Sequence, residues 1–300
     1  ASLMLLAGGG AEKDGKVYSV KPTDGSGDFT FSRGSNLSAT RVNASYLIEK
    51  GRENLLLQSN AFSTSPWTTS NTSVTSGQSG YDGSSDAWLL ETNGTQFASN
   101  IQSVSSSGVT TQSIYAKAGT LDFVILYTAS SASPRVWFNL SNGTIGSSPG
   151  GAFGASIQAV GNGWYRCSFA NNDTTTNFRI YPTGADNTFS TTAGSIYIQD
   201  AQLEQGLTAT PYIETTTTTG TAGILENTPR FNYSNGVSCP TLLLEPSRTN
   251  LIEQSEYFGG SYWSKNAPLS IVDNYDNSPE GARNGSRWVS SGGSYPQLGR

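Results

Sequence analysis

The chain has 300 residues, which is enough for one large domain or two ordinary ones. Only 13% of them are charged, the formal net charge is −5 and no run of Lys and Arg occurs, which excludes a nucleic-acid-binding protein. The absence of His removes the commonest general base, the usual neutral metal ligand and every nucleophile that His activates.

The composition favours strands over helices. Ser, Thr, Asn and Gly take the places where exposed helices carry Lys and Glu, and aromatic residues make up 11% of the chain. The two cysteines, Cys167 and Cys239, lie in different segments without a C-x-x-C spacing, so no zinc site is expected. We expect two buried reduced thiols, and the alternative is one disulfide between the two segments.

Residues 1–51 are rich in loop-forming residues and predict an extended segment with two short strand-like pieces, 28–33 and 39–43. The apolar run at the start, Leu3 to Ala7, has no basic flank. It is too short for a membrane span or for the core of a signal peptide, so no membrane association is expected.

Residues 52–214 predict a single all-β domain. Asn93-Gly94 predicts a tight hairpin between 87–92 and the residues that follow, and Asn142-Gly143 and Asn162-Gly163 predict two further turns. The other predicted strands are 111–119, 121–128, 135–140, 155–160, 164–170, 177–181 and 195–204. Many short strands with frequent turns and no helical periodicity are typical of a β-sandwich, and we predict a jelly roll.

A phrase of the sequence occurs twice. Residues 53–67 (E-N-L-L-L-Q-S-N-A-F-S-T-S-P-W) return as residues 249–263 (T-N-L-I-E-Q-S-E-Y-F-G-G-S-Y-W) at a constant offset of 196. The phrase marks the entry of a domain, so a second β module is expected to begin in 229–300, after a Thr-rich linker at 215–228. At the size of the first domain this module would be incomplete at residue 300, and a shorter, degenerate copy is the alternative.

Several motifs occur together and in order along residues 29–263. The pieces F-T-F-S-R, A-T-R-V-N and L-I-E in 29–49, with P-R-F-N-Y and C-P-T-L-L-L-E-P-S-R-T-N-L in 229–251, resemble the bacteriophage tail-fibre, head-fibre and head-spike virion proteins. The motifs Y-A-K-A-G-T (115–120), V-G-N-G-W-Y-R-C-S (160–168) and 197–213 resemble the jelly-roll, carbohydrate-binding-module-like domain of those proteins. In the usual family pattern the first set of pieces follows closely in sequence, whereas here 52–214 stands between them, as an inserted or duplicated jelly roll.

This resemblance implies a fibre or spike subunit of a virion, assembled in the bacterial cytoplasm and commonly trimeric. Residues 1–51 would attach it to capsid, collar or tail proteins, and Leu3, Leu5 and Leu6 are the candidate contacts, with a frayed terminus as the alternative. The jelly rolls would then project outward and touch glycans of the host surface. Two rival functions remain at this point: a tandem lectin-like bacterial adhesin, and the non-catalytic part of a phage polysaccharide depolymerase.

The candidate carbohydrate-binding residues are Tyr127, Trp137 and Tyr181, because they lie at strand ends or opposite the inward positions of their strands. Exposed rings stack on sugar faces, and the alternative is that each ring packs in the core or at its rim.

No catalytic residue, metal ligand or cofactor is predicted. Loop carboxylates at Asp82, Asp86, Glu91, Asp173, Asp186 and Asp200 could hold Ca²⁺, but no D-x-D-x-D-G pattern supports a site. A glycosidase that uses two carboxylates needs no His, yet no two acids stand at a fixed local spacing. The sequence therefore leads us to expect a chain that is not an enzyme.

Overall fold

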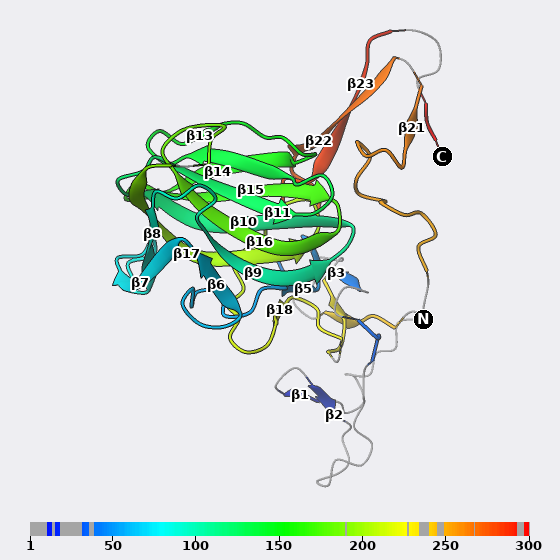
Figure 1. Cartoon of the computed structure of the whole chain (residues 1–300). Helices are drawn as coiled ribbons and strands as arrows, with labels where there is room; N and C mark the ends of the chain where they lie inside the picture. Colours follow the sequence, from blue (N-terminus) through cyan, green and yellow to red (C-terminus); the bar gives the residue numbers. More distant parts are fainter. Residues whose placement is uncertain are drawn as a thin grey trace. The chain divides into compact units, whose positions relative to one another are not determined.

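The computed structural model describes residues 11–13, 16–18, 32–35, 39–189, 191–226, 228–233, 240–244, 249–266, 268–292 and 297–299. The elements over these residues are all strands, which confirms the predicted all-β fold (Figure 1). The chain divides into two compact units. One comprises Ala1–Glu53, Thr221–Ser255 and Asn277–Arg283, and the other comprises Asn54–Gly220, Glu256–Asp276 and Asn284–Arg300.

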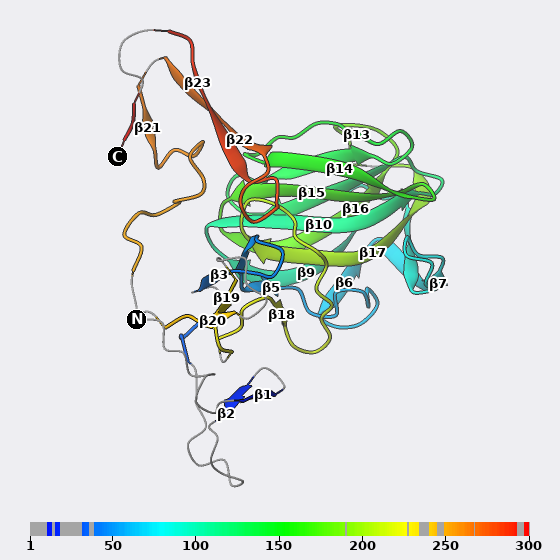
Figure 2. The ribbon, with the colours of Figure 1, turned by 180° about the vertical axis from the view of Figure 1, so that it is seen from behind.

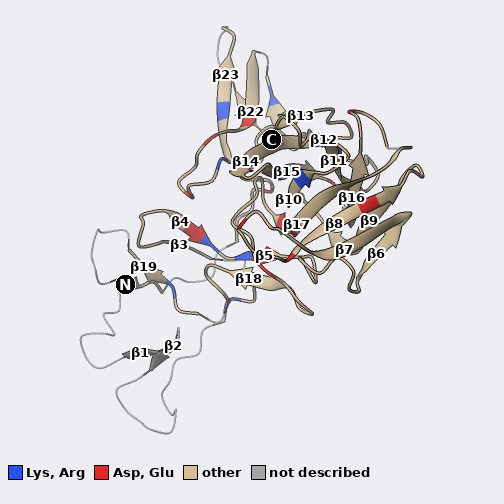
Figure 3. Ribbon diagram, turned by 90° about the vertical axis from the view of Figure 1, so that its left-hand side faces the viewer, with Lys and Arg blue, Asp and Glu red and all other residues tan. Residues whose placement is uncertain are grey.

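Two six-stranded antiparallel sheets form the β-sandwich of the second unit (Figures 1 and 2). The first sheet has the order β14(Phe153–Gly161)-β15(Trp164–Asn172)-β10(Val109–Ala118)-β17(Ala193–Gln205)-β8(Ala87–Asn93)-β7(Thr72–Gln78). The second has the order β13(Thr144–Ile145)-β12(Arg135–Asn139)-β11(Phe123–Ala129)-β16(Thr175–Thr183)-β9(Ser99–Ser106)-β6(Trp67–Ser70). Most residues of the strands are uncharged (Figure 3), as the composition predicts.

The core lies between the two sheets and follows from the two-residue period of the strands. On β11 the alternate residues Val124 and Leu126 point inward, and they belong to one core with Phe138 and Phe178 of the neighbouring strands and Phe169 of the opposite sheet. Cys167 is a free thiol in this core, and its burial raises its pKa because the thiolate is poorly solvated there. Cys239 lies outside the described residues.

Of the three turns predicted from Asn-Gly pairs, two join strands that pair with each other and one does not. Asn162 and Gly163 both take the left-handed conformation, with φ of 53° and 78°, and join β14 to its sheet partner β15 as predicted. Asn142-Gly143 likewise lies between the paired strands β12 and β13. The predicted hairpin at Asn93-Gly94 is wrong, because β8 and β9 belong to different sheets and the connection crosses from one layer to the other.

The two separated signature pieces come together in the first unit. In that unit β3(Thr40–Val42) pairs with β4(Ile48–Lys50), and β19(Phe231–Asn232) pairs with β20(Thr241–Leu242). The Val42 amide donates to Oδ1 of Asn232 at 3.0 Å, and the Tyr233 amide donates to the Val42 carbonyl at 3.0 Å. The sandwich is thus inserted into a small β unit whose sequence it interrupts. The unit also contains an ion pair between Lys50 and Glu280 at 3.0 Å.

The repeated phrase folds in the same way at both places. In the first copy the ring of Phe62 lies 5.0 Å from Trp67 and 6.2 Å from Trp88. In the second copy the ring of Phe258 lies 5.4 Å from Trp263 and 5.9 Å from Trp288. The elements of the second copy are β21(Ser264–Lys265), β22(Leu269–Asp276), β23(Gly285–Ser290) and β24(Leu298–Gly299).

The backbone that precedes these rings is repeated as well. Gln58 and Gln254 both have φ of 50°, an uncommon value for a residue with a side chain. Oδ1 of Asn54 accepts a hydrogen bond from the amide two residues later, and Oδ1 of Asn250 does the same. The repeat therefore reflects a local structure in which an Asn and a left-handed Gln set the entry of each module.

Candidate functional site

The three predicted carbohydrate-binding rings lie on one face of the second sheet. The register places Ile125 of β11 between Trp137 of β12 and Tyr181 of β16, and Tyr127 follows two positions after Ile125. These residues alternate with the core residues of the same strands, so they occupy the face turned away from the core. Together with Phe123 and Phe189 they form a separate apolar cluster, which we call the outer aromatic face.

Phe189, from the loop between β16 and β17, covers part of this face. Its ring centroid lies 5.0 Å from that of Tyr181 and 5.6 Å from that of Trp137. The Trp137 indole donates to the Thr188 carbonyl at 2.9 Å, which fixes the loop on the sheet. As a result Trp137 and Tyr181 are only 1% and 3% exposed, whereas Tyr127 is half-buried. Trp137 and Tyr181 therefore support other rings and do not offer an open face to a sugar.

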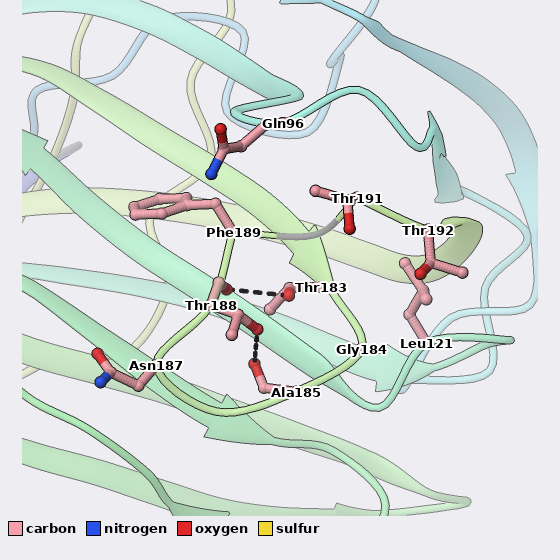
Figure 4. A pocket seen from close by; sticks show the side chains of 10 residues that line it. All are labelled: Gln96, Leu121, Thr183, Gly184, Ala185, Asn187, Thr188, Phe189, Thr191 and Thr192. Carbon is pink, nitrogen blue, oxygen red and sulfur yellow. Dashed lines mark hydrogen bonds between the residues drawn. The ribbon is translucent and has the colours of Figure 1, made fainter.

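A groove of about 660 Å³ lies beside the outer aromatic face, between this loop and the connection from β8 to β9 (Figure 4). Phe189 contributes the only aromatic ring among its lining residues, which are Gln96, Leu121, Thr183, Gly184, Ala185, Asn187, Thr188, Phe189, Thr191 and Thr192. Phe97 packs against Phe189 with ring centroids 4.8 Å apart and is 52% exposed. The groove thus combines one aromatic surface with amide and hydroxyl groups.

Hydrogen bonds within the β16–β17 loop hold the groove open. Oγ1 of Thr183 donates to the Thr188 carbonyl at 3.0 Å, and Oγ1 of Thr188 donates to the Ala185 carbonyl at 3.0 Å (Figure 4). Asn187 and Phe97 have left-handed backbones, with φ of 53° and 63°. Such conformations are costly for a bulky residue and are concentrated at sites that bind ligands.

Sequence reasoning missed the groove residues. Gln96, Phe97, Asn187 and Phe189 lie in loops, where no periodicity reveals which side chains gather. The available signal was the isolated aromatic ring in each polar loop, T-Q-F-A and N-T-F-S, because a large apolar side chain in a Ser/Thr/Asn-rich loop needs a packing partner or a ligand.

A second polar cluster lies where the connection between β7 and β8 meets β17 of the first sheet. The Gln199 amide donates to Asp86 at 2.8 Å and to Asp82 at 3.4 Å, while the Ser84 amide donates to Asp82 at 3.1 Å and the Ser84 hydroxyl donates to Asp86. Within the described part of the chain no group of three or more His, Cys, Asp or Glu residues is arranged to hold a metal ion. Asp173 and Asp186, two other loop carboxylates, accept hydrogen bonds from the amides of Ala132 and Ser147 and so fix their own loops.

Asp200 of β17, next to this cluster, gives the stability of the sandwich a pH dependence. Its burial raises its pKa to about 7, although the Tyr81 hydroxyl donates to it at 2.9 Å, and Asp86 and Asp82 raise the pKa further. The folded chain thus keeps a proton that the unfolded chain, with a pKa of about 3.9, releases. We expect the free energy of unfolding to fall as the pH rises from about 4 to about 7 and to level off above that.

Urea unfolding at pH 5 and at pH 8 measures this effect. The Asp200→Asn variant has no carboxyl to titrate and keeps an acceptor for Tyr81, so its loss of stability between the two pH values should be clearly smaller than that of the wild type. An equal loss in both proteins would show that Asp200 is ionised in the folded state at pH 5.

Among the described residues, the structure contains no helix with the length and hydropathy of a membrane-spanning segment. No protein-family model and no curated protein matches the chain.

A solved structure is similar to about half of the chain. It is a crystal structure of the enzymatically active domain of tailspike protein 4 from bacteriophage CBA120, with 16% identity and a TM-score of 0.31. The match covers 52% of this chain and 21% of the tailspike chain. Against the expectation that the chain is not an enzyme, the matched domain is enzymatically active, and that expectation is withdrawn. The likeness is to a tail protein of a bacteriophage, and at this TM-score it assigns no reaction to the chain.

Proposed function

We propose that the chain is a subunit of a bacteriophage fibre or spike, and that its β-sandwich binds glycans of the bacterial surface in the groove beside Phe189. The observation that carries the binding proposal is the combination in one groove of an aromatic ring with the polar side chains of Gln96, Asn187 and Thr191. The assignment to a virion is supported by the resemblance of the motifs in 29–49 and 229–251 to fibre and spike proteins.

The chemistry of a sugar fits this combination. The C–H face of a pyranose is apolar and packs on an aromatic ring, while its hydroxyl groups need donors and acceptors at the edge. Phe189 supplies the ring, and the side-chain amides of Gln96 and Asn187 each supply two donors and an acceptor. The hydrogen bonds of Thr188 fix the loop beforehand, so less conformational entropy is lost when a ligand is bound.

Attachment to the particle is proposed for residues 1–51, with other virion proteins as partners and a trimer as the assembly. The candidate contacts Leu3, Leu5 and Leu6 lie outside the described residues. Antibodies raised against the sandwich should label purified particles of the encoding phage in electron micrographs. Particles without label would contradict the assignment to the virion.

Two variants test the groove. Phe189→Ala removes the aromatic surface, and Gln96→Ala removes an exposed amide that is not required for packing. We expect Phe189→Ala to weaken binding to host-surface polysaccharide about tenfold or more, and Gln96→Ala about threefold to tenfold, as for the loss of one ring contact and one neutral hydrogen bond. Isothermal titration calorimetry with the full chain measures both effects.

The matched control is Tyr46→Ala. Tyr46 is 62% exposed and has φ of 62°, close to the values of Phe97, but it lies in the other unit. The Tyr46→Ala variant should bind the polysaccharide with the affinity of the wild type. Phe189→Ala also removes contacts with Trp137 and Tyr181. If this variant fails to fold, Gln96→Ala alone tests the groove. Unchanged affinity of a folded Gln96→Ala protein would count against binding in the groove.

A further inference from the structure

Two arginines flank a half-buried tyrosine in one row across the second sheet. The register pairs Tyr127 of β11 directly with Arg135 of β12 on one side and with Arg179 of β16 on the other. Side chains that are directly opposite on neighbouring strands lie on the same face about 5 Å apart at Cβ. The row Arg135–Tyr127–Arg179 therefore lies on the outer aromatic face, next to the row of Trp137, Ile125 and Tyr181.

The two guanidinium groups lie against rings of this face. That of Arg179 lies 5.5 Å from the ring centroid of Tyr127, and that of Arg135 lies 5.6 Å from the ring centroid of Trp137. Nη1 of Arg179 donates to the Tyr181 hydroxyl at 3.2 Å, and its Nε donates to Oδ1 of Asn177 at 2.8 Å. Both arginines are half-buried, so they are held in place rather than free in solvent.

Among the residues that the structure describes, no carboxylate forms an ion pair with Arg135 or Arg179. The ion pairs within the described part of the chain are Arg41–Glu49 and Lys50–Glu280, and both lie in the other unit. The hydrogen-bond acceptors of Arg135 and Arg179 are neutral, and Nε of Arg135 is buried without any partner. In a chain with a net charge of −5, two arginines without a carboxylate partner give this face a local positive charge.

We propose that the Arg135–Tyr127–Arg179 row binds an acidic sugar, with the pyranose ring on Tyr127 and its carboxylate between the two guanidinium groups. The planar fork of arginine matches a carboxylate, and the ring between the two charges selects a sugar acid over a simple inorganic anion. The inference rests on the proposed function, because it names the class of glycan that the same face recognises.

The row is continuous with the groove. The ring of Tyr127 lies 5.8 Å from that of Tyr181, which lies 5.0 Å from that of Phe189, a residue that lines the groove. The arginine row and the groove thus belong to one cluster of packed rings on the same side of the second sheet. The ligand class is an oligosaccharide that contains uronic acid or another carboxylated sugar.

The test compares acidic glycans with their neutral counterparts. Oligomers of galacturonate, hyaluronan and sialic acid are each titrated into the full chain beside the product of their carboxyl reduction. We expect the best acidic ligand to bind about tenfold or more tightly than its reduced form, and this preference to shrink as the salt concentration rises. Arg135→Gln and Arg179→Gln should each reduce this preference several-fold, measured in each variant as the ratio of its affinities for the acidic and the reduced form.

Two further variants separate charge from geometry. Arg179→Lys keeps the charge but loses the fork, so it should recover only part of the preference. Lys117→Gln is the matched control, because Lys117 lies 5.9 Å from the ring centroid of Tyr197 on the first sheet and its loss removes the same charge without touching the row. This variant should keep the full preference.

The outcomes distinguish the two proposals. Equal affinity for the acidic and reduced forms overturns the acidic-sugar site and leaves glycan binding in the groove standing. A preference that survives both Arg→Gln variants also overturns the site, since the anion is then recognised elsewhere. Failure of every acidic and neutral oligomer to bind overturns this inference and the proposed glycan binding together.

Discussion

Replacing Trp67 by alanine is expected to lower the free energy of unfolding of the β-sandwich by about 3–5 kcal/mol, the usual range for removal of a large buried aromatic side chain. Trp67 is 5% exposed. Its ring lies 5.0 Å from that of Phe62 and 6.0 Å from that of Phe178 on β16, and its indole donates to the Gln58 carbonyl at 2.9 Å. The variant loses these contacts, leaves a cavity and unpairs a carbonyl of the entry loop.

The repeat supplies the matched control. Trp263 occupies the same place in the second copy, but it is half-buried and belongs to a module of four short strands. Urea unfolding followed by far-ultraviolet circular dichroism reports mainly on the two six-stranded sheets. Trp263→Ala should change that transition by less than about 1 kcal/mol. A similarly small effect of Trp67→Ala would mean that the ring does not close the core.

The role of Trp67 shows what an internal repeat reveals from sequence alone. Two copies of E-N-L-L-L-Q-S and T-N-L-I-E-Q-S with a Trp at the same offset predict a common local structure, and the structure contains it down to the left-handed Gln58 and Gln254. The local hydrogen bonds and ring contacts that the repeat encodes lie within about thirty residues. They depend little on the rest of the chain, so the sequence suffices to predict them.

The pairing of strands was predicted less well than the local structure, because residues far from a turn decide which strands become neighbours in a sheet. Asn162-Gly163 and Asn93-Gly94 have the same sequence signal, yet the first joins sheet partners and the second joins opposite layers. After Gly94 the chain continues for four residues before β9 begins, and β9 then pairs with β6 and β16. An Asn-Gly pair thus fixes a reversal of the backbone, while long-range burial chooses the strand that becomes the neighbour.

The candidate site also combines features that the sequence predicts with features that it does not. The alternation of β11, β12 and β16 identifies Tyr127, Trp137 and Tyr181 as outward-facing, and the structure gathers them on one face. Their burial could not be predicted, because Phe189 covers two of them from a loop without periodicity. The pairing of Tyr127 with two arginines likewise needs the register of three strands that are distant in sequence.

Asn54→Leu is expected to destabilise the sandwich by about 4 kcal/mol or more, because one buried side chain serves four backbone groups. Nδ2 of Asn54 donates to the carbonyls of Ile213 and Ala201 at 2.9 and 3.2 Å. Its Oδ1 accepts from the amides of Leu56 and Leu203, each at 3.2 Å. Asn54 is completely buried, so water cannot replace these bonds, and each unsatisfied buried group costs about 1–3 kcal/mol.

Leucine has the same branching and the same number of side-chain heavy atoms as asparagine, so the variant leaves no cavity and tests mainly the loss of the hydrogen bonds. Asn250→Leu is the corresponding change in the second copy, where the side chain is exposed and Oδ1 accepts from the Ile252 amide at 3.0 Å. It should cost less than about 1 kcal/mol, because water satisfies an exposed amide. Urea unfolding compares the two. If the free energy of unfolding of Asn54→Leu lies within about 1 kcal/mol of the wild-type value, packing alone holds the chain entry and the segment around Ile213 to β17. The four hydrogen bonds of Asn54 would then not be needed for stability.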